Sequence, residues 1–170
     1  MPWIVLKFGG TSVSNLHNWR NIAAIVSDRL GTGRRVMVVH SAVSGITDKL
    51  EQLLAAALAG APDAVLIDIE ARHRKLCDEL GVGVSAALQA CFDELRRSAS
   101  VIAVSRQLDD RTRAAVIAQG ELMATEIGAR FMTAAGSRPR ERVSSPRRTI
   151  SFSRSTTRKP PEGATSTTTR

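Results

Sequence analysis

The sequence is poor in the residues that build disulfide scaffolds and metal centres. It contains two cysteines and three histidines in 170 residues. Cys77 and Cys91 lie within helical patterns, where small hydrophobic side chains are expected, and nothing marks the chain as secreted, so we expect no structural disulfide. The cysteines and His17, His40 and His73 do not follow the spacing of a zinc site. The sequence therefore predicts no metal site built from protein side chains.

Long apolar runs and targeting segments are also missing. No run approaches the roughly 20 apolar residues that cross a bilayer. The first residues lack the basic region, apolar stretch and cleavage site of a secretory signal. We therefore expect a cytoplasmic protein with no membrane partner.

Acidic and apolar residues become scarce at the carboxyl end. Residues 1–136 hold 15 Lys or Arg against 14 Asp or Glu, whereas residues 137–170 hold 9 against 2, so the net charge of +8 belongs almost wholly to the last 34 residues. Those residues include 14 Ser or Thr, 4 of the 6 prolines and only four apolar residues. Such a segment buries too little surface to offset its ordering entropy. We expect a folded domain over residues 1–136 and a disordered basic tail over residues 137–170.

A basic tail can attract nucleic acid or acidic membrane surfaces. Phe152 is the only aromatic residue in residues 137–170, so there is little on which bases could stack. Binding there would be nonspecific and strongly dependent on salt. We therefore expect no specific nucleic-acid partner.

The pattern of residues 1–136 predicts an α/β fold. Residues 3–8 and 35–40 are short apolar runs rich in β-branched residues, which is typical of buried strands. A helix over about residues 15–30 joins them, with Ser14 or Asn15 as its N-cap. Two strands joined by a helix form a βαβ unit with a parallel sheet and a right-handed crossover.

Helical patterns dominate the rest of the folded part. His73 is expected to be partly exposed, because Arg72, Arg74 and Lys75 surround it in the sequence. The further helices are expected at about residues 48–59, 63–80, 85–97 and 100–108, with a last one starting at Asp109 or Asp110.

The end of the first strand carries the strongest functional signal, in Lys7, Phe8, Gly9, Gly10, Thr11 and Ser12. Backbone N–H groups at a glycine turn and a helix start can bind phosphate, and a lysine can follow charge on a phosphoryl group as it transfers. The pattern differs from a P-loop and from a dinucleotide-binding motif, because the lysine precedes the glycines. On these residues alone, a tight turn without a ligand is the alternative.

A second loop follows the strand over residues 35–40. The carboxyl ends of parallel strands lie at one edge of a sheet, so we expect this loop beside the first. It offers three hydroxyl groups, among them those of Ser41 and Thr47. Asp48 is expected to cap the next helix, with Glu51 completing a capping box, which does not exclude ligand contacts by the hydroxyls.

Glu121 follows a glycine within an otherwise apolar segment. A buried carboxylate would need a partner, which would indicate a binding role. The alternative is that Glu121 is exposed at a break in the helix. The residues alone leave both interpretations open.

These three segments resemble the aspartate kinases, members of the amino-acid kinase family. The string from Lys7 to Val13 resembles the opening motif of those enzymes, and Ser41-Ala42 with Gly45-Ile46-Thr47 resembles their second signature. Gly120-Glu121, followed by a hydrophobic pair, resembles the third element. His40 stands where family members commonly have an apolar residue, and we interpret it as a local variation rather than a catalytic base.

The resemblance implies a reaction and a set of ligands. The reaction is phosphorylation of the side-chain carboxylate of L-aspartate by ATP with Mg²⁺, at the entry to lysine, threonine and methionine biosynthesis. Lys7 would be catalytic, and Thr47 and Glu121 would hold aspartate, Glu121 through the ammonium group. The phosphate-binding residues would be Lys7, Phe8, Gly9, Gly10, Thr11, Ser12 and Ser41.

The likeness covers about residues 3–136 and looks closest to the kinase half of bifunctional aspartate kinase/diaminopimelate decarboxylase proteins. It implies the N-terminal half of a three-layer, parallel-sheet kinase domain, and homo-oligomers for full-length members. Because the rest of the family's domain is absent, we expect a truncated product with an out-of-frame tail, inactive by itself, which resequencing the locus would test. The alternative is a non-catalytic fragment or partner protein whose basic tail binds nucleic acid nonspecifically.

Overall fold

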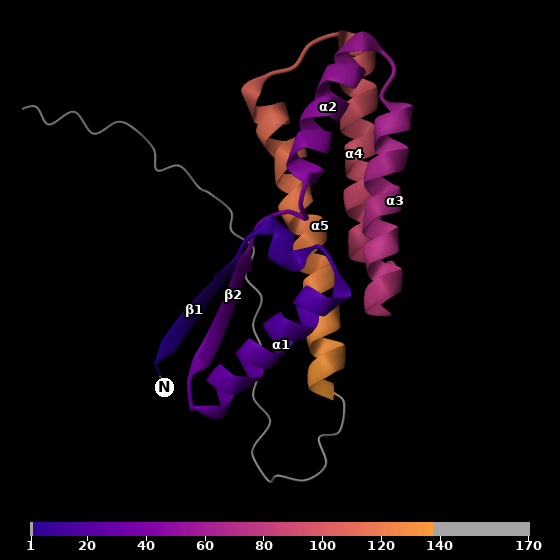
Figure 1. Cartoon of the computed structure of the whole chain (residues 1–170). Coiled ribbons are helices and arrows are strands. Elements are labelled where there is room, and N and C mark those ends of the chain that lie inside the picture. The colour runs from indigo at the N-terminus through magenta and orange to yellow at the C-terminus, as the bar shows by residue number, and fades with distance from the viewer. Residues whose placement is uncertain (1, 138–170) are drawn as a thin grey trace, which may run out of the picture.

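The computed structural model describes residues 2–137 (Figure 1), and the expectations for residues 138–170 lie outside them. The elements follow in the order β1 (Trp3–Phe8), the 3₁₀ helix η1 (Gly10–Val13), α1 (Leu16–Gly31), β2 (Arg35–His40), α2 (Ile46–Ala59), α3 (Asp63–Leu80), α4 (Ala86–Ser105) and α5 (Asp110–Ser137). The α/β class is confirmed, and helices dominate.

Strands β1 and β2 form a parallel pair, as the βαβ pattern predicted. Their register runs from Trp3 beside Arg35 to Phe8 beside His40, so both strands end at the same level. The bounds of both strands match the sequence prediction, because β-branched and other apolar residues dominate each run.

Helix α1 covers one face of this sheet. Asn15 is its N-cap, and the Asn15 side chain accepts a hydrogen bond from the Asn18 backbone N–H at 2.9 Å. Trp19, Ile22 and Val26 recur at helical spacing and are buried. The indole N–H of Trp19 donates to the Val13 carbonyl at 2.9 Å, which holds α1 to the loop after β1.

Helices α2, α3 and α4 pack together, and the long helix α5 runs from them to α1 (Figure 1). The buried side chains of both parts form one continuous core. Gly128 of α5 lies directly against the Trp19 ring: a Cβ there would be 2.1 Å from its Cη2 atom. Helix α5 therefore connects the sheet with the helical part.

Two predicted helix boundaries are wrong. Residues 86–105 form one helix rather than two, because Leu95, Ala99 and Ile102 continue the buried face across the polar serines. Helix α2 begins at Ile46, so Asp48 lies in its first turn and does not cap it. Gly45 is the N-cap instead, with a φ of 76° that favours glycine.

The predicted exposure of His73 is also wrong. Its side chain is buried, and its Nδ1 atom lies 2.7 Å from the Ile69 carbonyl. His73 belongs to the apolar face of α3 with Leu66, Ile69 and Leu76, while its charged sequence neighbours are exposed. The helical period, rather than the nearby charges, decides its position.

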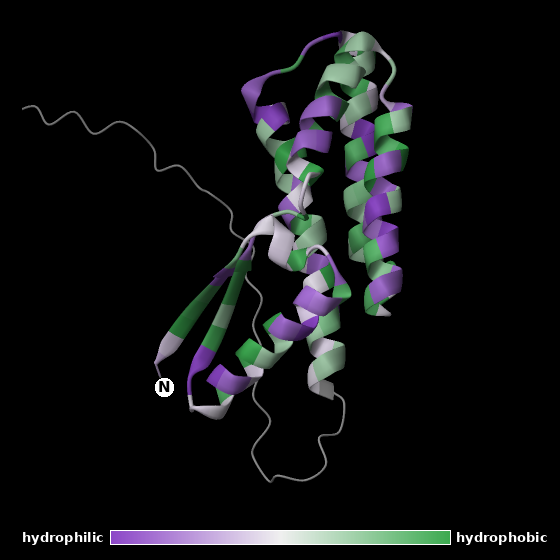
Figure 2. Cartoon of the chain, in the orientation of Figure 1, coloured by the Kyte–Doolittle hydropathy of each residue, from purple (hydrophilic) through white to green (hydrophobic). Residues whose placement is uncertain are grey.

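The other face of the sheet is open within the described residues. Alternate residues of β1 point to it, and Trp3 and Val5 are 51% and 60% exposed. Figure 2 shows that both strands are largely hydrophobic. No described helix combines the length and apolar composition needed to cross a membrane.

Candidate active site

The first part of the site is the end of β1. Lys7 is exposed on the open face of the sheet, whereas Phe8 points to the side of α1 and is half-buried. Lys7 pairs with Val39 in the strand register, and none of residues 2–137 forms an ion pair with it. Its ammonium group is therefore available to a ligand anion.

The two glycines after β1 differ in their surroundings. Gly9 has an extended backbone, with φ −77° and ψ 172°, and a Cβ there would meet nothing within 4 Å. A Cβ on Gly10 would be 2.7 Å from the Ala42 carbonyl oxygen and 3.3 Å from the Ser44 nitrogen. The fold needs a glycine at position 10 because the second loop lies against it, but not at position 9.

Hydrogen bonds join this loop to the second one. The Ser41 backbone N–H donates to the Phe8 carbonyl at 3.2 Å. The Ser14 hydroxyl donates to the Gly10 carbonyl at 2.5 Å and accepts from the Ser44 backbone N–H at 3.1 Å. Sequence reasoning considered Ser14 only as a helix cap and missed this bridging role, which its position directly after the loop could have suggested.

The second loop leads into helix α2. Ser41 is half-buried beside the end of β1, and Thr47 is exposed in the first turn of α2. The Ile46 backbone N–H donates to the Val43 carbonyl at 3.0 Å, which closes a tight turn before the helix. The amino terminus of α2, with its partial positive charge, thus lies beside the glycine loop.

Helix α5 brings Glu121 to the same region. A Cβ on Gly120 would lie 3.1 Å from the Ala42 Cβ and 3.2 Å from the Ile46 Cγ2, so α5 packs closely on the second loop. The Glu121 side chain is exposed, and its charge acts on His40 at the end of β2. Helix α5 continues through this point, so Glu121 is exposed without a break in the helix.

His40 lies between these parts. Its Nδ1 atom is 3.0 Å from the Ser41 carbonyl, and its ring meets the Trp19 ring edge-on at 5.6 Å. Burial lowers the pKa of His40 below its ordinary value, while the hydrogen bond to Ser41 and the charge of Glu121 act in the opposite direction.

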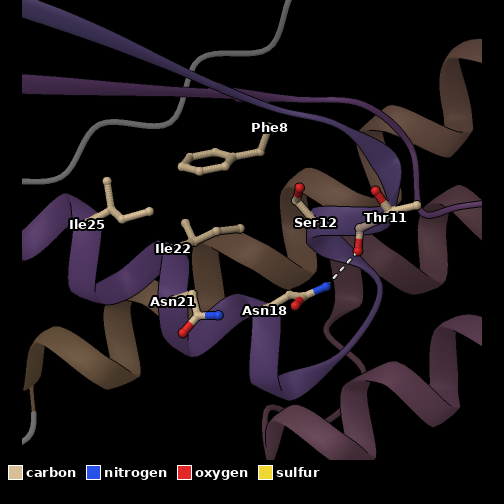
Figure 3. Close-up of a pocket in the computed structure, with 7 residues that line it drawn as sticks. All are labelled: Phe8, Thr11, Ser12, Asn18, Asn21, Ile22 and Ile25. Carbon is tan, nitrogen blue, oxygen red and sulfur yellow. Dashed lines mark hydrogen bonds between the residues drawn. The ribbon is translucent and has the colours of Figure 1, made fainter.

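A pocket lies on the α1 side of the first loop and encloses about 210 Å³ (Figure 3). The Asn18 amide donates to the Thr11 carbonyl at 2.8 Å across it. Its lining residues are Phe8, Thr11, Ser12, Asn18, Asn21, Ile22 and Ile25. The predicted phosphate-binding residues are therefore divided, since Phe8, Thr11 and Ser12 line this pocket while Lys7 faces the opposite side of the strand.

Among residues 2–137, no group of three or more His, Cys, Asp or Glu side chains gathers as a metal site would require. The other predicted residues come from three separate segments at the carboxyl ends of the strands. Such an edge, with a glycine loop and helix starts, defines an α/β domain suited to binding a phosphorylated ligand.

The particular family follows from sequence comparison. The model of the amino acid kinase family matches residues 2–149, and the chain belongs to this family. The aspartokinase of Chlamydia trachomatis is 38% identical over 85 residues, which are 50% of this chain and 19% of that protein. The aspartokinase of Rickettsia felis is 42% identical over 53 residues, which are 31% of this chain and 13% of that protein.

Solved structures show the same fold. Aspartokinase III of Escherichia coli in complex with lysine and aspartate (T-state) aligns with a TM-score of 0.53 and 25% identity, over 76% of this chain and 28% of that one. The same enzyme in complex with aspartate and ADP (R-state) aligns with a TM-score of 0.52 and 22% identity, over 79% and 29%. The chain thus spans less than a third of the length of these relatives.

Proposed function

We propose that residues 2–137 carry the amino-terminal part of an aspartate kinase site, which transfers the γ-phosphate of ATP to the side-chain carboxylate of L-aspartate. The observation that carries the proposal is the meeting of three segments at one sheet edge. Gly10 touches Ala42, and Gly120 packs on Ala42 beside Glu121. Segments 110 residues apart in sequence therefore lie against the same loop, as a shared ligand site would require.

The phosphate side of the site would be formed by the first loop. Lys7 is exposed, without an ion-pair partner in the described residues, and would stabilise the charge of the transferring phosphoryl group. Gly9 and Gly10 would donate backbone hydrogen bonds, and Ser41 would lie opposite them. Thr11 and Ser12, with Phe8, would support this wall from the α1 side.

The substrate side would be formed by Thr47 and Glu121. Glu121 is exposed, and its carboxylate suits the ammonium group of an amino acid. Thr47 lies at the amino terminus of α2, where hydroxyl and N–H donors suit a carboxylate. One neighbouring structure, aspartokinase III, contains aspartate and ADP, which supports this choice of ligands.

The chemistry needs few protein groups. A carboxylate is already a competent nucleophile, so no general base is required, and catalysis depends on holding two anions in line and neutralising their charge. Mg²⁺ would be held mainly by phosphate oxygens and water, and we assign it no ligand from this chain. The product, aspartyl phosphate, would enter lysine, threonine and methionine biosynthesis in the cytoplasm.

The test is ATP-dependent phosphoryl transfer to L-aspartate, followed with isotopic ATP and by hydroxamate formation. If the 170-residue chain is active, Lys7→Met should lower the rate about a hundredfold or more. Lys75→Met is the matched control, because Lys75 is an exposed lysine on α3 and should leave the rate unchanged.

A measurement of ATP binding distinguishes an active kinase from a non-catalytic fragment. A chain that binds ATP through Lys7 without transferring phosphate would support the alternative of a non-catalytic fragment. If ATP binding were the same in the chain with Lys7 and in Lys7→Met, the proposed phosphate site would be refuted.

A further inference from the structure

His40 lies at the proposed site, but the proposed reaction gives its side chain no role. It ends β2 opposite Phe8, directly before the second loop. Its side chain is half-buried and meets the Trp19 ring of α1, and two residues further on Ala42 lies against Gly120 of α5, the neighbour of Glu121. A polar ring in this place needs partners, since an unmatched buried polar group is costly.

One ring nitrogen has a partner and the other has none. The Ser41 carbonyl lies 3.0 Å from Nδ1 and can only accept, so in the neutral ring Nδ1 carries the proton and donates to it. The Nε2 atom then holds a lone pair, and it is buried without a hydrogen-bond partner in the described residues. A protonated ring would bury an N–H donor at Nε2 that lacks an acceptor, so the packing favours the neutral form.

The charge that faces this ring comes from α5. Trp19 on α1 and the Ser41 carbonyl are neutral, whereas Glu121 is the charged group whose field acts on His40. No hydrogen bond or ion pair joins Glu121 to His40 within the described residues, so the two groups interact through space. The carboxylate is exposed and can bind an external cation.

We propose that His40 is a positioning residue: its neutral imidazole holds the Ser41 carbonyl and leaves Glu121 free for the substrate ammonium group, and its protonated form weakens that binding. The inference rests on the proposed role of Glu121. Protonation places a positive charge near Glu121, which competes with the ammonium group for the same carboxylate. It also adds a donor at Nε2, which disturbs the packing that fixes Ser41.

The charge coupling is tested by NMR titration of the histidine ring protons in the full chain. The chain has only three histidines, so His17→Gln and His73→Gln variants assign the signals. Because Glu121 favours the imidazolium form, Glu121→Gln should move the His40 midpoint to lower pH. Glu126→Gln is the matched control, since Glu126 is on the same helix but binds Ser85, and it should leave the midpoint unchanged. An unchanged midpoint in Glu121→Gln would overturn the proposal.

The substrate effect is tested by the dissociation constant of L-aspartate between pH 7.5 and pH 5. It should rise roughly threefold to tenfold in the native chain over the part of this range, extended to lower pH where needed, in which the NMR titration shows His40 becoming protonated. His40→Asn, whose amide can still donate to the Ser41 carbonyl, should keep the affinity at pH 7.5 and lose the dependence on pH. His40→Val removes the donor as well and should bind more weakly at both pH values.

These experiments separate the inference from the proposed function. If L-aspartate does not bind at any pH, the proposed function fails. The charge coupling between His40 and Glu121 is still tested, by the His40 midpoint in Glu121→Gln. If L-aspartate binds with the same pH dependence in His40→Asn as in the native chain, the proposed function stands and the role of His40 is refuted.

Discussion

At the scale of single residues, a side chain at each of the two glycines of the first loop would have a different effect. Gly10 lies against the backbone of the second loop, so a side chain there collides with atoms that cannot rotate away. Gly9 has open space and an ordinary φ of −77°. The fold therefore does not require a glycine at position 9, where we propose that the missing side chain leaves room for the ligand.

This difference gives a paired prediction. Gly10→Ala should lower the free energy of unfolding by about 1–3 kcal/mol, as forced overpacking does. Gly9→Ala should leave the melting temperature nearly unchanged but weaken ATP binding, because the new methyl group lies where phosphate would approach. Thermal melts and an ATP titration of both variants are the measurements. A large loss of stability in Gly9→Ala would contradict the prediction.

His73 makes stability depend on pH. Burial lowers its pKa, the charge of Arg72 acts in the same direction, and the hydrogen bond to Ile69 opposes them. A histidine with a lowered pKa in the folded state binds its proton more readily when unfolded. The resulting stability is complete above the unfolded pKa of about 6.5 and is lost as the pH falls from there toward the folded pKa.

Urea unfolding at pH 7.5 and pH 5 measures this effect. The native chain should be less stable at pH 5, and His73→Leu should lose less stability between the two values. Some dependence should persist in His73→Leu, because burial also lowers the pKa of His40. If the pH dependence were identical in both chains, His73 would not be its source.

At the scale of elements, α5 fixes the position of the sheet and α1 relative to the other helices, because it packs against both parts. It packs on the second loop at Gly120 and on the Trp19 ring at Gly128. Between these contacts lie Glu121 and three buried residues, Met123, Ala124 and Ile127. The position of Glu121 therefore depends on close helix contacts at two glycines, where an added methyl group would be tight at Gly120 and would collide with Trp19 at Gly128.

The contact at Gly128 can be tested by stability. Alanine normally stabilises a helix by up to about 1 kcal/mol relative to glycine. At Gly128 the added methyl group would collide with Trp19, so Gly128→Ala should instead lower the free energy of unfolding by about 1–3 kcal/mol. Gly136 has no atom within 4 Å of its Cβ position, so Gly136→Ala is the control and should be neutral or slightly stabilising. Equal effects of the two substitutions would contradict this packing.

At the scale of the whole molecule, the described residues leave a two-stranded sheet with one open face. Trp3 and Val5 are exposed there, and the Trp3 ring contacts the Arg35 guanidinium at 5.4 Å. Sheet edges and exposed apolar patches promote association between chains.

We therefore expect the chain to self-associate through this face. Trp3→Gln combined with Val5→Thr should reduce the apparent mass in light scattering while changing the melting temperature little. Val104→Thr is the control, because Val104 is 86% exposed but lies on α4, away from the sheet. If the control reduced association as much as the sheet variant, the open face would not be the cause.

Much of the fold was predictable because it depends on local patterns. Each strand consists mainly of β-branched and other apolar residues, and Asn15 is a good N-cap directly before an amphipathic helix. Helix boundaries were less predictable, since the serines of α4 suggested a break that packing of Leu95 and Ile102 overrides. The predictions for the basic tail concern residues outside the described part and stay predictions.

The sequence by itself determined the βαβ start, the residues that follow each strand and their resemblance to a kinase family, because strand patterns and loop motifs are local. Only the tertiary structure decided that Gly10 touches Ala42, that Ser14 joins the two loops, that His73 is buried, and that α5 packs on the second loop at Gly120, next to Glu121. These facts depend on contacts between segments far apart in the chain, and such contacts are set by side-chain packing across elements rather than by the pattern within any one of them.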